Sequence, residues 1–122
     1  MSRVLLPVKE GDTWNIAIQC RDSLGAAYNL TGFTAHMQIR TAPKGTVLVE
    51  LGSAGGDIEM NSPDPGDLLV IVDSDTTEGL TLNNHNRTLY ADVELRDAAT
   101  PPLVITVAAL EFDVEPDSTI RV

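Results

Sequence analysis

Apolar and polar residues alternate at every second position in three separate stretches of this chain, residues 13–21, 33–40 and 89–96. The apolar positions are Trp14, Ile16, Ile18 and Cys20, then Phe33, Ala35, Met37 and Ile39, then Leu89, Ala91, Val93 and Leu95. Successive side chains of a β-strand point to opposite faces, so a period of two is typical of a strand with one buried face. The pattern predicts three strands and a core built from Trp14, Ile16, Ile18, Phe33, Met37, Ile39, Leu89, Val93 and Leu95.

Five shorter segments are further strand candidates, which gives about eight strands in all. They are residues 4–8, 47–51, 58–60, 68–73 and 104–114. No apolar run approaches the ~18 residues that cross a bilayer. The first residues also lack the long apolar stretch and the cleavage site of a signal peptide.

Turn residues separate these segments. Asp22-Ser23-Leu24-Gly25 suits a tight turn, and Ala42-Pro43-Lys44-Gly45 has the proline and glycine positions of a type I turn. Two prolines in residues 61–66 and two more in residues 98–102 interrupt any strand there.

A single helical turn is predicted near residues 75–80. Asp75-Thr76-Thr77-Glu78 resembles a capping box with Asp75 as the cap, and Gly79 would end the helix. Many short strands with almost no helix favour a sandwich or a barrel, and a helical turn between strands favours the sandwich. The sequence therefore predicts one all-β domain over residues 1–122, an antiparallel immunoglobulin-like β-sandwich with one helical turn.

The charge balance argues against some classes of partner. Eight basic and 18 acidic residues give a net charge of −10 and a pI near 4.3. Nucleic-acid binding needs Lys and Arg gathered on one face, and the basic residues are scattered along the sequence. We expect neither nucleic acid nor an anionic membrane as a partner.

No pattern of catalytic or metal-ligating residues occurs. His36 and His85 have no ligand partner at a metal-binding spacing, and Cys20 lies on the apolar side of its strand, as a buried structural cysteine would. No nucleophile elbow, phosphate loop or dinucleotide fingerprint is present. We therefore assign no catalytic, cofactor-binding or metal-binding residue and expect a protein that is not an enzyme and needs no cofactor.

A calcium- or carbohydrate-binding sandwich is the second interpretation, and the acidic and the aromatic residues bear on it. Acidic residues gather in or beside predicted loops, at Asp64, Asp67, Asp73, Asp75 and Glu78. Converging loop carboxylates are what calcium requires. Carbohydrate-binding sandwiches use exposed aromatic residues, and this chain has only five: Trp14, Tyr28, Phe33, Tyr90 and Phe112. Tyr90 begins a predicted strand after a loop, where a structural tyrosine corner is expected.

Several short motifs follow one another in a fixed order. They are Gly11-Asp12-Thr13-Trp14, Arg21-Asp22-Ser23-Leu24-Gly25, Tyr28-Asn29-Leu30-Thr31-Gly32, the strand at 35–40, Thr76-Thr77-Glu78-Gly79-Leu80 and the strand at 89–95. In this order they resemble the small β-sandwich proteins of tailed-bacteriophage and prophage structural gene clusters, and they are similar to the N-terminal domain of baseplate upper proteins. Residues 98–102 replace the Asp-Gly hairpin usual in that family.

The resemblance implies a non-enzymatic virion component of the tail, baseplate or connector, assembled in the cytoplasm of a bacterial host. Its partners would be other virion structural proteins or further copies of the chain. Such a protein works through the edge strands and loops of its sandwich. Residues 4–8 are the expected edge strand, in which Pro7 lacks the backbone N–H that could donate a hydrogen bond to another chain. The sequence is also compatible with an enzyme or with an unrelated bacterial interaction domain.

Overall fold

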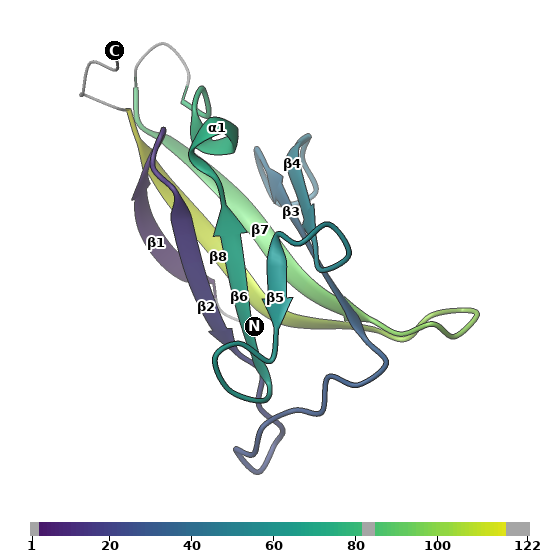
Figure 1. The fold of residues 1–122 in the computed structure, drawn as a ribbon. Helices are drawn as coiled ribbons and strands as arrows, with labels where there is room; N and C mark the ends of the chain where they lie inside the picture. The colour runs from purple at the N-terminus through teal and green to yellow at the C-terminus, as the bar shows by residue number, and fades with distance from the viewer. Residues whose placement is uncertain (1–2, 82–84, 117–122) are drawn as a thin grey trace.

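Eight strands and one helical turn form two sheets that pack face to face in the computed structural model, which describes residues 3–81 and 85–116 (Figure 1). The elements are β1 (Val4–Lys9), β2 (Trp14–Gln19), β3 (Thr34–Arg40), β4 (Val47–Gly52), β5 (Ile58–Met60), β6 (Asp67–Val72), α1 (Ser74–Thr77), β7 (Arg87–Arg96) and β8 (Val104–Glu115). The predicted all-β sandwich with one helical turn is confirmed. Within the described residues, no helix is long and apolar enough to span a membrane.

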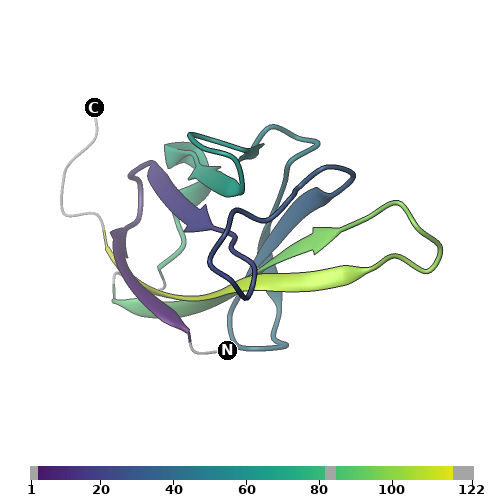
Figure 2. The same ribbon diagram turned by 90° about the horizontal axis from the view of Figure 1, so that it is seen from below.

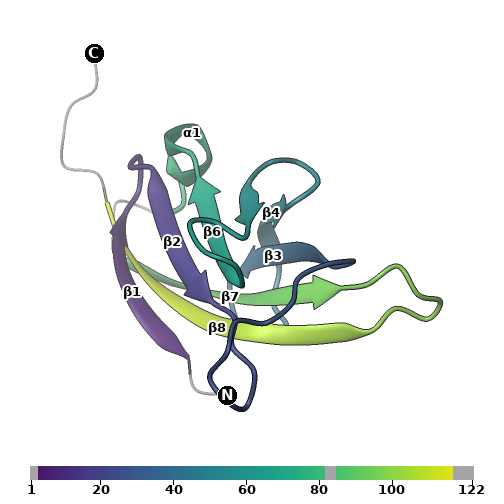
Figure 3. The same cartoon turned by 60° about the horizontal axis from the view of Figure 1, so that its bottom comes forward.

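The larger sheet has the strand order β1-β8-β7-β3-β4, and the smaller has the order β2-β6-β5 (Figures 2 and 3). One strand pair departs from the predicted antiparallel arrangement, because β1 runs parallel to β8. These are the first and last strands of the sandwich. No hairpin joins them, so no short turn imposes an antiparallel direction.

The core lies between the sheets and contains the residues that the period-two pattern selected. Eight of the nine predicted core residues are buried, and Cys20 is buried with them. Phe33 is the exception, since it precedes β3 and is only half-buried, with its ring packed edge-on against Tyr28. One aromatic contact between the sheets is the stacking of Trp14 in β2 on Phe112 in β8.

The helical turn begins two residues earlier than a cap at Asp75 would allow. Asp73 is the cap: its side chain accepts a hydrogen bond of 2.7 Å from the Thr76 N–H, and Asp75 lies in the first turn. Strand β6 ends at Val72, so Asp73 is the first residue free to adopt the extended cap conformation. Gly79 follows the helix with a φ of +81°, as predicted.

The turn at residues 42–45 is also of a different type from the prediction. The Gly45 N–H donates to the Ala42 carbonyl at 2.7 Å, but Lys44 has a φ of +64°. A positive φ at the third position defines a type II turn and not a type I turn.

Candidate functional site

Two sheet edges open on the same side of the sandwich and define the candidate site. β1 ends the larger sheet and β2 ends the smaller one, and the two strands lie side by side (Figures 1 and 3). A groove of about 390 Å³ runs between them, with Leu6 and Val8 on one wall and Trp14 and Ile16 on the other. We call this groove with its two strands the lateral edge.

The open side of β1 can be deduced from its hydrogen bonds. The Glu10 N–H donates to the Glu115 carbonyl at 2.9 Å, which continues the ladder to β8. Backbone groups alternate in direction along a strand, so those of Leu5, Pro7 and Lys9 point away from β8. Pro7 therefore stands where its missing N–H removes no ladder bond. The Lys9 carbonyl accepts the Trp14 indole N–H at 2.8 Å.

Two hydrogen bonds show which backbone groups of β2 point toward β6 and which point to the open side. The Cys20 N–H donates to the Gly66 carbonyl at 2.9 Å, and the Ile71 N–H turns away from β2 toward the Asp57 carbonyl at 2.8 Å. Asn15 is paired with Ile71, so that pair exchanges no bonds. By the same alternation, the backbone groups of Asn15, Ala17 and Gln19 point to the open edge.

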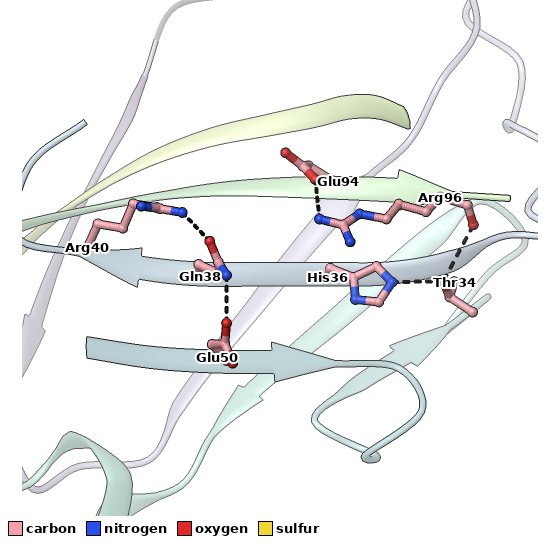
Figure 4. Close-up of polar contacts among 7 residues, drawn as sticks. All are labelled: Thr34, His36, Gln38, Arg40, Glu50, Glu94 and Arg96. Atoms are coloured by element: carbon pink, nitrogen blue, oxygen red, sulfur yellow. Dashed lines mark hydrogen bonds and ion pairs between the residues drawn. The ribbon is translucent and has the colours of Figure 1, made fainter. Parts of the chain in front are cut away.

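A second surface is the outer face of β3, β4 and β7, where polar side chains form a network (Figure 4). Gln38 in β3 links two strands: it accepts from Arg40 and donates to Glu50 of β4 at 2.6 Å. His36 Nε2 lies 2.8 Å from Thr34 Oγ1. Arg96 and Glu94 form an ion pair of 3.1 Å along β7. We call this surface the polar face.

The polar face brings together basic residues that are scattered along the sequence. A depression of about 520 Å³ on this face is lined by Arg3, Arg40, Lys44 and Arg96, half of the basic residues in the chain. Three acidic residues line the same depression: Glu50, Asp92 and Glu94. The strands gather residues that lie far apart in sequence, and the interspersed carboxylates prevent a strongly positive surface. Arg121 lies outside the described residues.

Tyr90 does not form the expected tyrosine corner. Leu89 and Ala91 point into the core, so Tyr90 between them points outward on the polar face. The Arg3 guanidinium lies over its ring, 5.4 Å from the centroid, and forms an ion pair of 3.1 Å with Asp92. A cation over an aromatic ring is attractive, so Tyr90 anchors the residue that leads into β1.

The acidic residues singled out from the sequence are not brought together. Asp67 is buried and pairs with Arg21 at 3.2 Å, while Asp73 caps α1 and Glu78 ends it. In residues 3–81 and 85–116, no group of three or more His, Cys, Asp and Glu side chains is placed to hold a metal ion. Hydrogen bonds from Thr76 lower the pKa of Asp73.

The five aromatic residues do not form an exposed platform for a sugar ring. Trp14 and Phe112 are buried against each other, and Tyr28, Phe33 and Tyr90 are half-buried. Cys20 is buried, and desolvation raises the pKa of its thiol. His36 belongs to the polar face, and His85 is exposed between the helical turn and β7.

No protein-family model matches the chain, and no curated protein is significantly similar to it in sequence. Two solved structures are similar to this chain at low sequence identity. One is a nucleoside hydrolase-related hypothetical protein from Saccharophagus degradans that is associated with carbohydrate metabolism, with 12% identity and a TM-score of 0.41 over 93% of this chain and 23% of that one. The other is the periplasmic chaperone SfaE, with 13% identity and a TM-score of 0.46 over 98% of this chain and 57% of that one. This chain thus spans less than two thirds of either protein.

Proposed function

We propose that this protein is a non-enzymatic structural component of a tailed-phage or prophage virion, in the tail, baseplate or connector, and that it acts through assembly contacts. The observation that carries the assembly role is the lateral edge, where both sheets end in strands that pair with a neighbouring strand on one side alone, beside a groove lined by both apolar and polar residues. The ordered motifs shared with baseplate upper proteins support the virion setting.

Strand β1 offers a partner both backbone groups and apolar side chains. Val4 is 56% exposed and Leu5 is 58% exposed, which is high for large aliphatic residues in a strand. An extended segment of a partner can add to such an edge, since main-chain bonds supply affinity and side-chain pockets supply specificity. Leu6 and Val8 line the groove that would receive the partner's side chains.

The net charge sets the salt dependence of these contacts. At −10, two copies repel each other, so their association strengthens as salt screens the repulsion. A partner with a basic surface instead binds more tightly at low salt. The direction of the salt effect therefore separates self-association from binding to a basic virion protein.

The test is sedimentation of the purified chain across a salt series, alone and with the products of the neighbouring genes. Capsid, portal or tail genes on either side are expected. Leu5→Asp should weaken the complex, and the matched control Leu103→Asp should not, because Leu103 is similarly exposed at 53% but lies before β8, far from the lateral edge. A chain that binds none of these products at any salt concentration would overturn the proposal.

A further inference from the structure

The four strands that end the two sheets differ in how they discourage pairing. Natural proteins protect open edges with proline, charge, bulges or short strands. β1 carries Pro7 and Lys9, β5 has only three residues, and β4 carries Glu50 beside a register shift. β2 has the sequence WNIAIQ, with no proline and no charge, and its pairing with β6 is regular. Among the described strands that end a sheet, β2 is thus the one that carries none of these features.

The open side of β2 is complementary to itself. Its outward-facing residues are an amide, an alanine and a second amide: Asn15, Ala17 and Gln19. All three are exposed. If two β2 strands meet antiparallel with Ala17 opposite Ala17, then Asn15 faces Gln19 of the other copy on both sides. Every outward-facing backbone group then has a partner, and each facing pair exchanges two hydrogen bonds.

This register is the only antiparallel one that uses all three outward-facing residues of both strands. Shifting it by two residues places Asn15 or Gln19 opposite a residue outside β2. Shifting it by one residue places outward-facing groups opposite groups that point toward β6. Side chains also match in the centred register, since amide pairs can hydrogen-bond and the two alanines leave room for close approach.

We propose that a second copy of this chain pairs with the first through β2, antiparallel about a two-fold axis at Ala17, so that the two smaller sheets become one continuous sheet. An interface that uses the same patch on both copies closes as a dimer and does not propagate. The proposal rests on the assembly role above and adds one partner and one strand to it.

A second copy fits β2 because the strand itself brings no like charges together. The repulsion between the two copies comes from the rest of the molecule, where 18 acidic residues outnumber eight basic ones. It acts over distances that salt screens, with a Debye length of about 10 Å at 0.1 M. The dimer should therefore form more readily as salt rises.

The experiment is sedimentation equilibrium of the full chain and of single variants, at about 0.05 M and about 0.5 M NaCl, where screening differs several-fold. Ala17→Lys places two positive charges opposite each other at the axis and should weaken the dimer about tenfold or more. Ala17→Glu should do the same. An equimolar mixture of the two variants should restore the dimer, because unlike charges then face each other. Thr106→Lys, an exposed strand position of the larger sheet, should behave as the unmodified chain does.

Circular dichroism establishes that each variant is folded, as expected for an exposed position. A chain that is monomeric at both salt concentrations would overturn the dimer. Dimers that withstand Ala17→Lys and Ala17→Glu alike, or a mixture that fails to restore association, would overturn pairing about Ala17. A monomeric chain that still binds products of neighbouring genes would overturn this inference and leave the proposed function standing.

Discussion

The indole of Trp14 stacks on the ring of Phe112, with their centroids 5.2 Å apart and their planes inclined by 24°. Trp14 belongs to β2 and Phe112 to β8, so this contact joins the two sheets. Trp14 also donates its indole N–H to the Lys9 carbonyl at the end of β1. One side chain therefore connects the core to both strands of the lateral edge.

Replacing Phe112 should destabilise the whole domain. The side chain is fully buried, so Phe112→Ala removes a large apolar group and leaves a cavity, at a cost of about 3–5 kcal/mol in the free energy of unfolding. Leu24→Ala is the control, since Leu24 is 91% exposed and its loss should change stability by less than about 0.5 kcal/mol. Denaturant titration measures both, and equal midpoints for the two variants would contradict the packing described.

Thr77 holds the helical turn against the connection between β1 and β2. It is fully buried, and its hydroxyl accepts from the Gly11 N–H at 2.9 Å and donates to the Asp12 carbonyl at 2.7 Å. Thr77→Val keeps the shape and removes both bonds, so it should lower the free energy of unfolding by about 1–3 kcal/mol. Thr88→Val, at an exposed strand position, should have little effect. Unchanged stability in Thr77→Val would contradict this role.

Asp73 should make stability depend on pH in acid. Hydrogen bonds from Thr76 lower its pKa in the folded state relative to the unfolded value of about 3.9. Its stabilising contribution is therefore present above the unfolded pKa and is lost as the pH falls through the folded pKa. Asp73→Asn keeps a capping oxygen but does not titrate, so its unfolding midpoint should fall less between about pH 5 and about pH 2. Equal pH profiles would contradict this prediction.

Cys20 should be unreactive in the folded protein. Its thiol is buried, and desolvation raises its pKa more than the neighbouring Arg21 lowers it. Since the thiolate is the nucleophile, iodoacetamide should modify Cys20 slowly until the chain is denatured. A chain carrying both Leu24→Cys and Cys20→Ser should react quickly, because position 24 is exposed. Rapid labelling of native Cys20 would contradict its burial.

Much of the fold could be predicted because local alternation fixes which side of a strand is buried. In β2, β3 and β7 the inward positions follow directly from the period of two. Phe33 fits the same pattern and is nevertheless half-buried, since it precedes β3 and packs at the margin of the core. The alternating pattern predicts which face of a strand a side chain lies on. It does not predict how completely the opposite sheet buries that side chain.

The surfaces are harder to predict because they depend on pairing between distant segments. Arg3 and Asp92 meet only because β1 lies beside β8 and β8 beside β7. No local signal specifies that order, so neither the grouping of basic residues on the polar face nor the parallel direction of β1 can be read from the sequence pattern. Both Asp73 and Asp75 are suitable caps, and the end of β6 decides between them.

Hydrogen–deuterium exchange is the most direct test of the lateral edge as the assembly surface. Amides of the isolated chain would be compared at low and high protein concentration and in mixtures with the products of neighbouring genes. We predict slower exchange at Asn15, Ala17 and Gln19 when copies associate, and at Leu5 and Lys9 when a partner binds, with no change in β4 at the opposite edge. Complexes that form without slowing any of these five amides, or that protect β4 instead, would contradict the account.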